Sequence, residues 1–106
     1  MDKTETGSIS SEDLAAALEA GKPLVIVDVR QPEQYQAGHL PGAVNIPLVD
    51  LWDRRMELDP TKDIITYCNS GNSGGTAKNV LLSLGFRSVC NLEGGYNGWK
   101  ALKGLG

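Results

Sequence analysis

The chain has 106 residues, of which 41% are hydrophobic and 22% are charged, and its formal net charge at pH 7 is -3. This length and composition are typical of one globular domain with its own hydrophobic core, and they leave no room for a second domain. Lysine and arginine are scattered, so we expect neither nucleic acid nor a membrane surface as a partner. No apolar run reaches the roughly 18 residues that a membrane helix needs.

The cysteines and the single histidine indicate a compartment and argue against a common kind of metal site. Cys68 and Cys90 occur in a chain without a charged-then-apolar signal segment, which favours thiols in a reducing compartment, and hence the cytoplasm. One histidine, His39, and two separated cysteines do not form a zinc-binding pattern, so no metal is expected.

The first part of the chain predicts a tail, a helix and an interior strand. Residues 1–7 are polar and charged and predict a flexible N-terminal tail, which leaves residues 8–106 as the single domain. A short strand near Ile9 and a serine cap precede a helix that is expected to end at Gly21. Residues 24–29 form a nearly continuous β-branched run, typical of a central parallel strand covered on both faces.

The rest of the chain predicts helices and strands in alternation, joined by short connections. The helices are expected at residues 32–38, 48–56, 76–84 and 94–102, and the strands at 43–46, 64–67 and 89–92. In the second of these helices, Leu48, Leu51 and Trp52 would share one side. The alternation predicts an α/β fold in which helices cover both faces of a parallel sheet.

The most informative segment starts at Cys68, where an apolar strand ends in a turn rich in glycine, serine and asparagine. A helix follows the turn, so Cys68 is expected at the positive end of a helix dipole, which favours a thiolate. The turn glycines Gly71, Gly74 and Gly75 would accept positive φ and let backbone N–H groups point at a bound anion. A buried structural cysteine is the alternative, but such a turn would need one glycine at most.

Other polar residues are expected beside Cys68 on one rim of the sheet. In parallel sheets, ligands bind outside the carboxyl ends of the strands. Asp28 and Arg30 lie at the end of one predicted strand, Asn45 at the end of another, and Cys68 at the end of a third. Asp28 and Arg30 either orient the Cys68 loop or form a local salt bridge with each other and Glu33, and we favour the salt bridge.

Four segments of the chain, at residues 28–30, 38–47, 68–73 and 94–99, together resemble a single-domain rhodanese. The resemblance spans residues 9–102 and implies a three-layer α/β/α fold with a central parallel sheet of five strands. It also implies sulfur transfer without a cofactor. A sulfane sulfur would move from thiosulfate or a persulfide to cyanide or a thiol, which could belong to a protein.

The resemblance assigns roles to particular residues of this chain. Cys68 would be the catalytic nucleophile that becomes a persulfide. Asp28 and Arg30 are expected as supporting residues because of their position on the same rim, and not from the resemblance. Backbone N–H groups of the loop would stabilise the persulfide, as an oxyanion hole stabilises an oxyanion. The loop residues are Asn69, Ser70, Gly71, Asn72, Ser73 and Gly74.

The loop departs from the family pattern at one position. Many rhodaneses end the loop with an arginine, where this chain has Ser73, and neither arginine nor lysine occurs between Cys68 and Lys78. The related Cdc25-type phosphatases need one more loop residue and then an arginine, where this chain has Gly74. Phosphate-ester hydrolysis is therefore disfavoured. The missing arginine motivates an alternative function, a sulfur-relay or regulatory module that acts on a partner protein.

The remaining residues of chemical interest are assigned structural roles. His39 would fix its turn, because it lies between glycine and proline residues, and Cys90 would be buried in a strand and inert. Arg54 and Arg55 are placed on a solvated helix face. Lys78 has a better claim to contact the substrate, because it follows the loop in the second turn of the next helix, but no catalytic role is assigned to it. The aromatic residues Trp52, Tyr96 and Trp99 are placed in the core.

Overall fold

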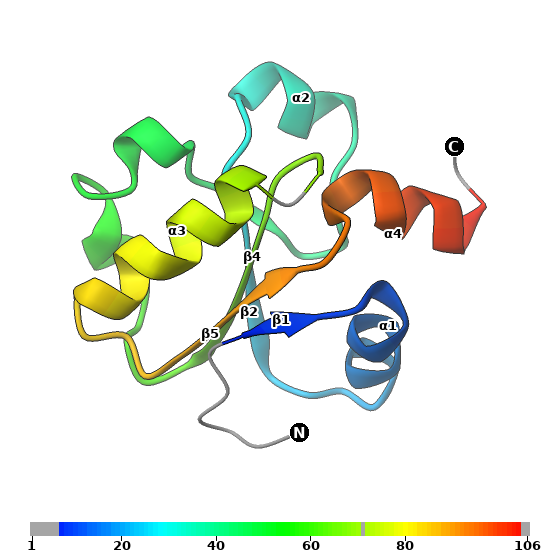
Figure 1. Ribbon diagram of the computed structural model, residues 1–106, viewed down its shortest axis with the longest axis horizontal. Coiled ribbons are helices and arrows are strands. Elements are labelled where there is room, and N and C mark those ends of the chain that lie inside the picture. Colours follow the sequence, from blue (N-terminus) through cyan, green and yellow to red (C-terminus); the bar gives the residue numbers. More distant parts are fainter. Residues whose placement is uncertain (1–6, 71, 105–106) are drawn as a thin grey trace.

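The computed structural model describes residues 7–70 and 72–104, and its chain alternates between strands and helices (Figure 1). The strands are β1 (Ser8–Ile9), β2 (Leu24–Asp28), β3 (Val44–Asn45), β4 (Asp63–Tyr67) and β5 (Ser88–Leu92). The α-helices are α1 (Ser11–Glu19), α2 (Pro32–Ala37), α3 (Asn72–Ser83) and α4 (Gly95–Lys103), and two 3-10 turns are η1 (Leu48–Asp50) and η2 (Arg55–Glu57). Within these ranges no helix combines the length and apolar character that crossing a bilayer requires.

The expected N-terminal tail falls almost wholly outside the described residues. Of residues 1–7, only Gly7 is described. Its carbonyl oxygen accepts a hydrogen bond from the backbone N–H of Asn91 at 3.1 Å, so Gly7 is attached to β5. Gly7 is therefore part of the folded domain.

All five strands are parallel, in the order β1-β5-β4-β2-β3. The run at residues 24–29 forms β2, an interior strand as expected, while β4 is the middle one. The register pairs Asp28 with Tyr67, so β2 and β4 end at the same level. Residues that follow these two strands, Arg30 and Cys68 among them, consequently meet at one rim.

Two hydrophobic clusters lie on opposite faces of the sheet. On one face, Val27 and Ile64 pack against Ala77 and Leu81 of α3. On the other face, the core is formed with α1 and α4, and its buried members are Ile9, Leu14, Ile26, Leu40, Ala43, Ile65, Tyr67, Cys90, Leu92 and Trp99. Figure 1 shows α3 on one side of the strands and α1 and α4 on the other. The expected three-layer α/β/α arrangement is confirmed.

The first helix forms for the reasons that its sequence suggests. Ser10 is the N-cap residue of α1, and its hydroxyl accepts a hydrogen bond from the N–H of Asp13 at 3.0 Å. Leu14 is fully buried beneath the helix. After the helix, Gly21 adopts φ +75, a conformation that glycine enters without a steric penalty.

The helix expected at residues 48–56 is wrong, because the segment forms the separate 3-10 turns η1 and η2. Leu51 is buried and Leu48 partly buried, but Trp52 is 57% exposed, with the Arg55 guanidinium 4.2 Å from its ring centroid. A short helix is stabilised mainly by packing of a continuous apolar face. Before Leu58 this segment buries only the side chains of Leu48 and Leu51, which is too little to stabilise an α-helix. Backbone hydrogen bonds such as Leu51 N–H to the Leu48 carbonyl therefore close tighter turns.

The start of α3 also differs from the expectation, because the helix begins at Asn72 and includes part of the predicted turn. Gly74 and Gly75 are helical and do not have positive φ. Gly74 instead permits close packing on the sheet. A Cβ atom there would overlap the side-chain oxygen of Asn91 and lie 3.1 Å from the Tyr67 Cα. The Thr66 hydroxyl donates to the Gly74 carbonyl at 2.8 Å across the same contact.

We expect Gly74→Ala to destabilise the domain and Gly75→Ala, its neighbour on the same helix, to leave it unchanged or stabilise it. The first adds a methyl group to a filled contact, which costs about 1–3 kcal/mol of unfolding free energy. The second has Asn91 Nδ2 at 3.8 Å from the new Cβ, ordinary contact, and gains up to about 1 kcal/mol of helix propensity. Urea denaturation followed by circular dichroism measures both, and equal shifts would contradict the packing role of Gly74.

Candidate functional site

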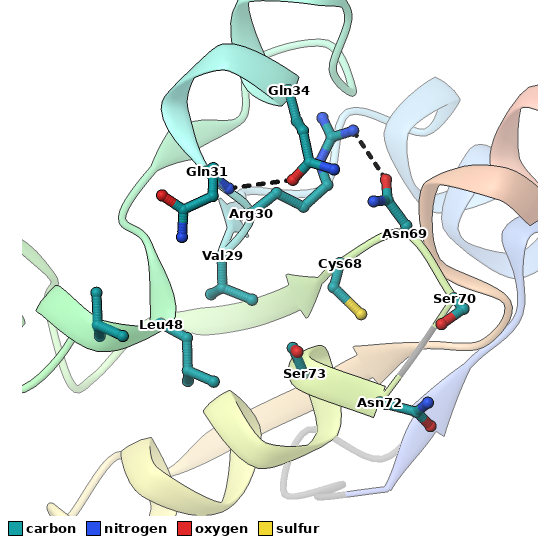
Figure 2. Close-up of a pocket in the computed structure, with 11 residues that line it drawn as sticks. Val29, Arg30, Gln31, Gln34, Leu48, Cys68, Asn69, Ser70, Asn72 and Ser73 are labelled. Carbon is teal, nitrogen blue, oxygen red and sulfur yellow. Dashed lines mark hydrogen bonds between the residues drawn. The ribbon is translucent and has the colours of Figure 1, made fainter.

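A pocket of about 410 Å³ opens at the carboxyl ends of β2 and β4 (Figure 2). Its walls come from the segment after β2, the start of α2, η1, and the loop that joins β4 to α3. The lining residues are Val29, Arg30, Gln31, Gln34, Leu48, Val49, Cys68, Asn69, Ser70, Asn72 and Ser73.

Most of the residues expected at the site are brought together here. Cys68, its loop partners and Arg30 share the wall of the pocket. Asp28 lies behind Arg30 and does not line the pocket, and Gly74 is buried in α3 against the sheet. Gly71 lies outside the described residues.

Cys68 connects the middle strand of the sheet to the N-terminal end of α3. The residue is 7% exposed and belongs to the core cluster on the α3 face. In Figure 2 its sulfur points toward the start of that helix, beside Ser70 and Ser73. The first-turn N–H groups of a helix carry partial positive charge, so this end of α3 attracts an anion bound in the pocket.

The loop backbone is held by the start of α4. The N–H of Tyr96 donates to the Cys68 carbonyl at 2.7 Å, and the N–H of Asn97 donates to the Asn69 carbonyl at 3.0 Å. In a trans peptide the N–H points opposite to the carbonyl, and the described chain has no cis peptide. The N–H groups of Asn69 and Ser70 therefore point away from α4, which contributes no residue to the pocket lining.

Gly95 makes this contact possible. Its φ is +56, and a Cβ atom there would lie 2.5 Å from the Cys68 carbonyl oxygen and 2.6 Å from the Asn69 carbonyl carbon. Only a residue without a side chain lets α4 come this close to the loop. The sequence contains this glycine in the segment 94–99, but nothing in the local pattern showed which backbone it touches.

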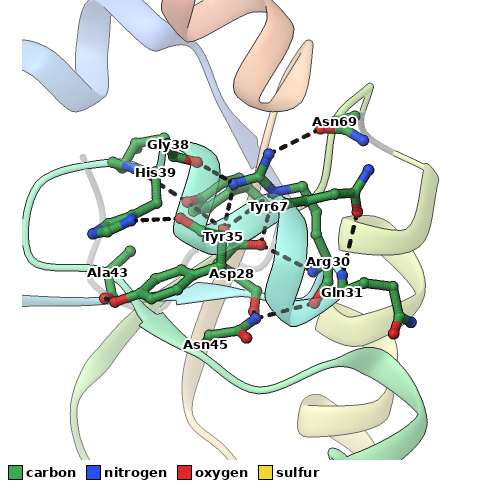
Figure 3. A network of polar contacts seen from close by, with 12 residues as sticks. Asp28, Arg30, Gln31, Tyr35, Gly38, His39, Ala43, Asn45, Tyr67 and Asn69 are labelled. Atoms are coloured by element: carbon green, nitrogen blue, oxygen red, sulfur yellow. Dashed lines mark hydrogen bonds and ion pairs between the residues drawn. The ribbon is translucent and has the colours of Figure 1, made fainter.

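Arg30 links the Cys68 loop to the end of β2 (Figure 3). Its guanidinium donates to Asp28, with Nη2 2.7 Å from Oδ2 and Nε 3.0 Å from Oδ1. It also donates to the Gly38 carbonyl at 2.6 Å and, through Nη1, to Asn69 Oδ1 at 3.1 Å. The favoured salt bridge with Asp28 is confirmed, but Arg30 contacts the loop as well, while Glu33 is exposed on α2.

Two aromatic rings enclose the Arg30 guanidinium. Its central carbon lies 4.5 Å from the ring centroid of Tyr96 and 5.5 Å from that of Tyr67. Burial lowers the pKa of Arg30, but the hydrogen bond and charge of Asp28 raise it by more, so the net shift is upward. The guanidinium stays charged inside the wall of the pocket.

Tyr67 was missed from the sequence, where it read as one more apolar residue of a strand. It is fully buried; its hydroxyl donates to Asp28 Oδ2 at 2.8 Å and accepts from the Leu40 N–H at 3.1 Å. Burial raises the pKa of Tyr67 far above its ordinary range, and the adjacent Asp28 carboxylate adds to the rise. The hydroxyl therefore remains a donor to Asp28. A tyrosine immediately before the loop cysteine was the available signal.

Asn45 lies on the expected rim but serves the backbone. Its side-chain Nδ2 donates to the carbonyls of Asp28 at 2.9 Å and Arg30 at 3.0 Å. These bonds attach β3 to the segment that carries Arg30. Asn45 is not among the residues that line the pocket.

His39 and Cys90 lie away from the pocket wall. The His39 imidazole is exposed; Nδ1 lies 2.9 Å from the Tyr35 carbonyl, and the ring stacks on the Tyr35 ring at 3.9 Å. This arrangement fixes the turn after α2, as expected. Cys90 is 1% exposed and belongs to the cluster on the face opposite Cys68.

The basic residues considered from the sequence do not line the pocket either. Arg54 is partly exposed and pairs with Glu57 at 2.8 Å, which raises the pKa of Arg54 mainly through that hydrogen bond. Arg55 lies over Trp52, and Lys78 is in the second turn of α3. Among the lining residues that the structure describes, Arg30 is the one with a charged side chain.

Comparison with known proteins gives the family. The family model for the rhodanese-like domain matches residues 10–102. A thiosulfate sulfurtransferase of Escherichia coli, PspE, is 43% identical over 70 residues, which cover 64% of this chain and 67% of that protein. A transcriptional regulator of Mycobacterium tuberculosis of the helix-turn-helix type is 49% identical over 61 residues, or 58% of this chain but 26% of the regulator. The chain thus spans about a quarter of that relative.

A solved structure extends the similarity to nearly the whole fold. The solution structure of the rhodanese-like domain of an Anabaena protein superposes with a TM-score of 0.85 and 36% identity, covering 96% of this chain and 76% of that one. The parallel sheet order, the loop after β4 and the family match agree with the segments singled out in the sequence. This chain belongs to the rhodanese-like domain family.

Proposed function

We propose that the domain is a sulfurtransferase that carries a sulfane sulfur on Cys68. The sulfur comes from thiosulfate or a persulfide and leaves to a thiophilic acceptor such as cyanide or a thiol. The observation that carries the proposal is the position of Cys68 in the pocket wall, at the start of α3, with the carbonyls of its loop turned toward α4. The similarity to the Escherichia coli protein named as a thiosulfate sulfurtransferase supports it.

The proposed reaction is two displacements at sulfur. The Cys68 thiolate attacks the outer sulfur of thiosulfate, the S–S bond of thiosulfate breaks, and sulfite leaves with the electron pair. The outer sulfur of the Cys68 persulfide is then attacked by the acceptor, which restores the thiolate. The first step oxidises the Cys68 sulfur to the persulfide level at the expense of thiosulfate, and the second returns it to the thiolate, so the cycle needs no cofactor or metal.

The backbone N–H groups beside Cys68 are neutral donors. The N–H groups of Asn69 and Ser70 point away from α4, and the first turn of α3 presents further N–H groups. Ser73 stands where an arginine would add a full positive charge. Preorganised N–H donors can stabilise the single, diffuse negative charge of a persulfide. A transferring phosphoryl group carries more charge, and enzymes stabilise it with arginine, lysine or metal cations.

The setting of the reaction is part of the proposal. Cys68 and Cys90 belong to core clusters on opposite faces of the sheet and form no disulfide, which is consistent with a reducing compartment such as the cytoplasm. We place the active unit within residues 8–106 as a single domain. Small sulfur donors and acceptors, and a thiol protein, are the partners we expect.

The second candidate is a sulfur-relay or regulatory module that acts on a protein partner and turns over free thiosulfate slowly. The absence of a cationic residue in the described part of the loop favours it, and so does the similarity to the Mycobacterium tuberculosis protein named as a transcriptional regulator. Thiocyanate production from thiosulfate and cyanide, compared with sulfur transfer to a thiol protein, separates the two. A relay module would be fast only with the protein.

The first prediction of the proposed function concerns the sulfur carrier. After incubation with thiosulfate, the intact protein should gain the mass of one sulfur atom, and Cys68→Ser should abolish the gain. Cys90→Ser is the matched control, because Cys90 is buried on the other face and should leave the gain unchanged. Mass spectrometry of the intact protein measures both, and a sulfur found on Cys90 would refute the assignment.

The second prediction concerns Arg30 as a positioning residue. Arg30→Lys keeps a positive charge beside Asp28 but loses the fork that also reaches Gly38 and Asn69. We expect kcat for sulfur transfer to fall about tenfold or more, because small displacements of reacting groups are costly. KM should change less than kcat.

Two further variants keep this test interpretable if Arg30→Lys folds poorly. Asn69→Ala removes the acceptor on the loop and leaves the buried ion pair intact, so it should lower kcat with a small change in melting temperature. Arg87→Lys, at an exposed arginine, should change neither. Unaltered kcat in both Arg30→Lys and Asn69→Ala would show that the contact does not position the loop.

A further inference from the structure

Two side-chain amides of the pocket wall have their orientation set by their neighbours. Oε1 of Gln34 accepts from the backbone N–H of Gln31 at 3.2 Å, and Oδ1 of Asn69 accepts from Arg30 Nη1 at 3.1 Å (Figure 2). A backbone N–H and a guanidinium can only donate, so each amide must turn its oxygen toward them. The NH₂ groups of Gln34 and Asn69 therefore remain as donors for a molecule in the pocket.

The other part of the wall is apolar. Val29, Leu48 and Val49 line it, and Val49 is 80% exposed at the rim. Figure 2 shows Val29 and Leu48 on the other side of Cys68 from Asn69. Such a surface stabilises an aliphatic group by removing it from water, and it offers nothing to a small hydrated anion.

The pocket also carries little net charge. The guanidinium of Arg30 is neutralised by Asp28 at 2.7 Å and covered by the ring of Tyr96. The loop position that would hold an arginine is Ser73. A dianion that enters the pocket loses its hydration shell. Neutral donors and one helix N-terminus replace the lost interactions of its two charges poorly.

We propose that the pocket selects an organic persulfide with a peptide-like body, R–S–SH, over inorganic thiosulfate. Carbonyl or carboxylate oxygens of R accept from the NH₂ groups of Gln34 and Asn69, and its aliphatic carbons lie against Leu48 and Val49. The inference rests on the proposed sulfur transfer at Cys68 and names the class of its donor.

The transfer step balances without an added oxidant or reductant. The Cys68 thiolate attacks the outer sulfur of R–S–SH, a new S–S bond forms on Cys68, and the S–S bond of the donor breaks. R–S⁻ leaves with the electron pair and takes up the proton of the persulfide. The products are the Cys68 persulfide anion and the thiol R–SH.

Donor selection is tested by the rate at which Cys68 gains sulfur, measured as kcat/KM for three probes. These are glutathione persulfide, persulfidated serum albumin and thiosulfate. We expect at least one organic persulfide to exceed thiosulfate about tenfold or more, a difference equivalent to one or two hydrogen bonds. The ratio of kcat/KM for glutathione persulfide to kcat/KM for persulfidated albumin shows whether the preferred donor is a small molecule or a protein. Thiosulfate equal to or faster than both would overturn the inference.

Variants of Gln34 test the recognition itself. Gln34→Glu keeps an oxygen for the Gln31 N–H but replaces the NH₂ donor, and Gln34→Met removes the amide without adding charge. Both should raise KM for the preferred organic persulfide about tenfold. Gln34→Met should raise KM for the organic persulfide by a larger factor than it raises KM for thiosulfate. Gln36→Met is the matched control, because Gln36 is exposed on the same helix and outside the pocket wall.

The outcomes separate this inference from the proposed function. If no donor places sulfur on Cys68 of the unaltered protein, the sulfurtransferase proposal fails. If thiosulfate labels Cys68 but the organic persulfides do not, only the donor class is wrong. The role of Gln34 would also be overturned by a Gln34→Met variant that is as stable as the parent protein and in which sulfur transfer is slowed equally from every donor or from none.

Discussion

The buried ion pair between Asp28 and Arg30 is the interaction on which the arrangement of the pocket depends. Asp28 is fully buried, and its carboxylate accepts from the guanidinium and from the Tyr67 hydroxyl. Removing one member would leave a buried charge or a buried dipole unmatched, so the three groups hold one another in a single arrangement. Because Arg30 also donates to Gly38 and Asn69, that arrangement extends to the turn after α2 and to the loop after β4.

Parallel pairing of β2 and β4 makes this network possible. The two strands run in register and end level, so an aspartate that closes one lies beside a tyrosine that closes the other. The loop cysteine comes one residue later, and α4 then fixes its carbonyl from the opposite side. Three independent sets of contacts thus restrain Cys68 and its loop. They come from the pairing of β2 with β4, from the buried ion pair of Arg30, and from the N-terminal end of α4.

The sequence predicted the features that depend on local pattern. The apolar runs at residues 24–29 and 64–67 gave interior strands, and their alternation with helices gave the parallel sheet. The predicted helix at residues 48–56 was wrong. Leucines three residues apart stabilise a helix only where the rest of the fold provides an apolar surface for them to pack against. Gly74 was also treated as a turn residue, although its neighbours Asn91 and Tyr67 are brought near only by the fold.

Contacts between residues that are far apart in the sequence could not be predicted from local sequence pattern. Tyr67 reads as an apolar strand residue until its hydroxyl is seen beside Asp28, 39 residues earlier. Tyr96 was expected in the core, yet it covers Arg30 and its N–H holds the Cys68 carbonyl. The resemblance to a family pointed to the segment 94–99 but not to these contacts.

The separation of the two cysteines by the sheet has a chemical consequence. Cys68 and Cys90 lie in clusters on opposite faces, so neither sulfur can attack the other while the domain is folded. A two-cysteine protein whose thiols meet can resolve an oxidised sulfur internally as a disulfide. This domain has no such route within the described residues. Sulfur bound to Cys68 must therefore leave to an acceptor on another molecule, such as cyanide or a thiol, and a sulfenic acid formed there must be reduced by a thiol from another molecule.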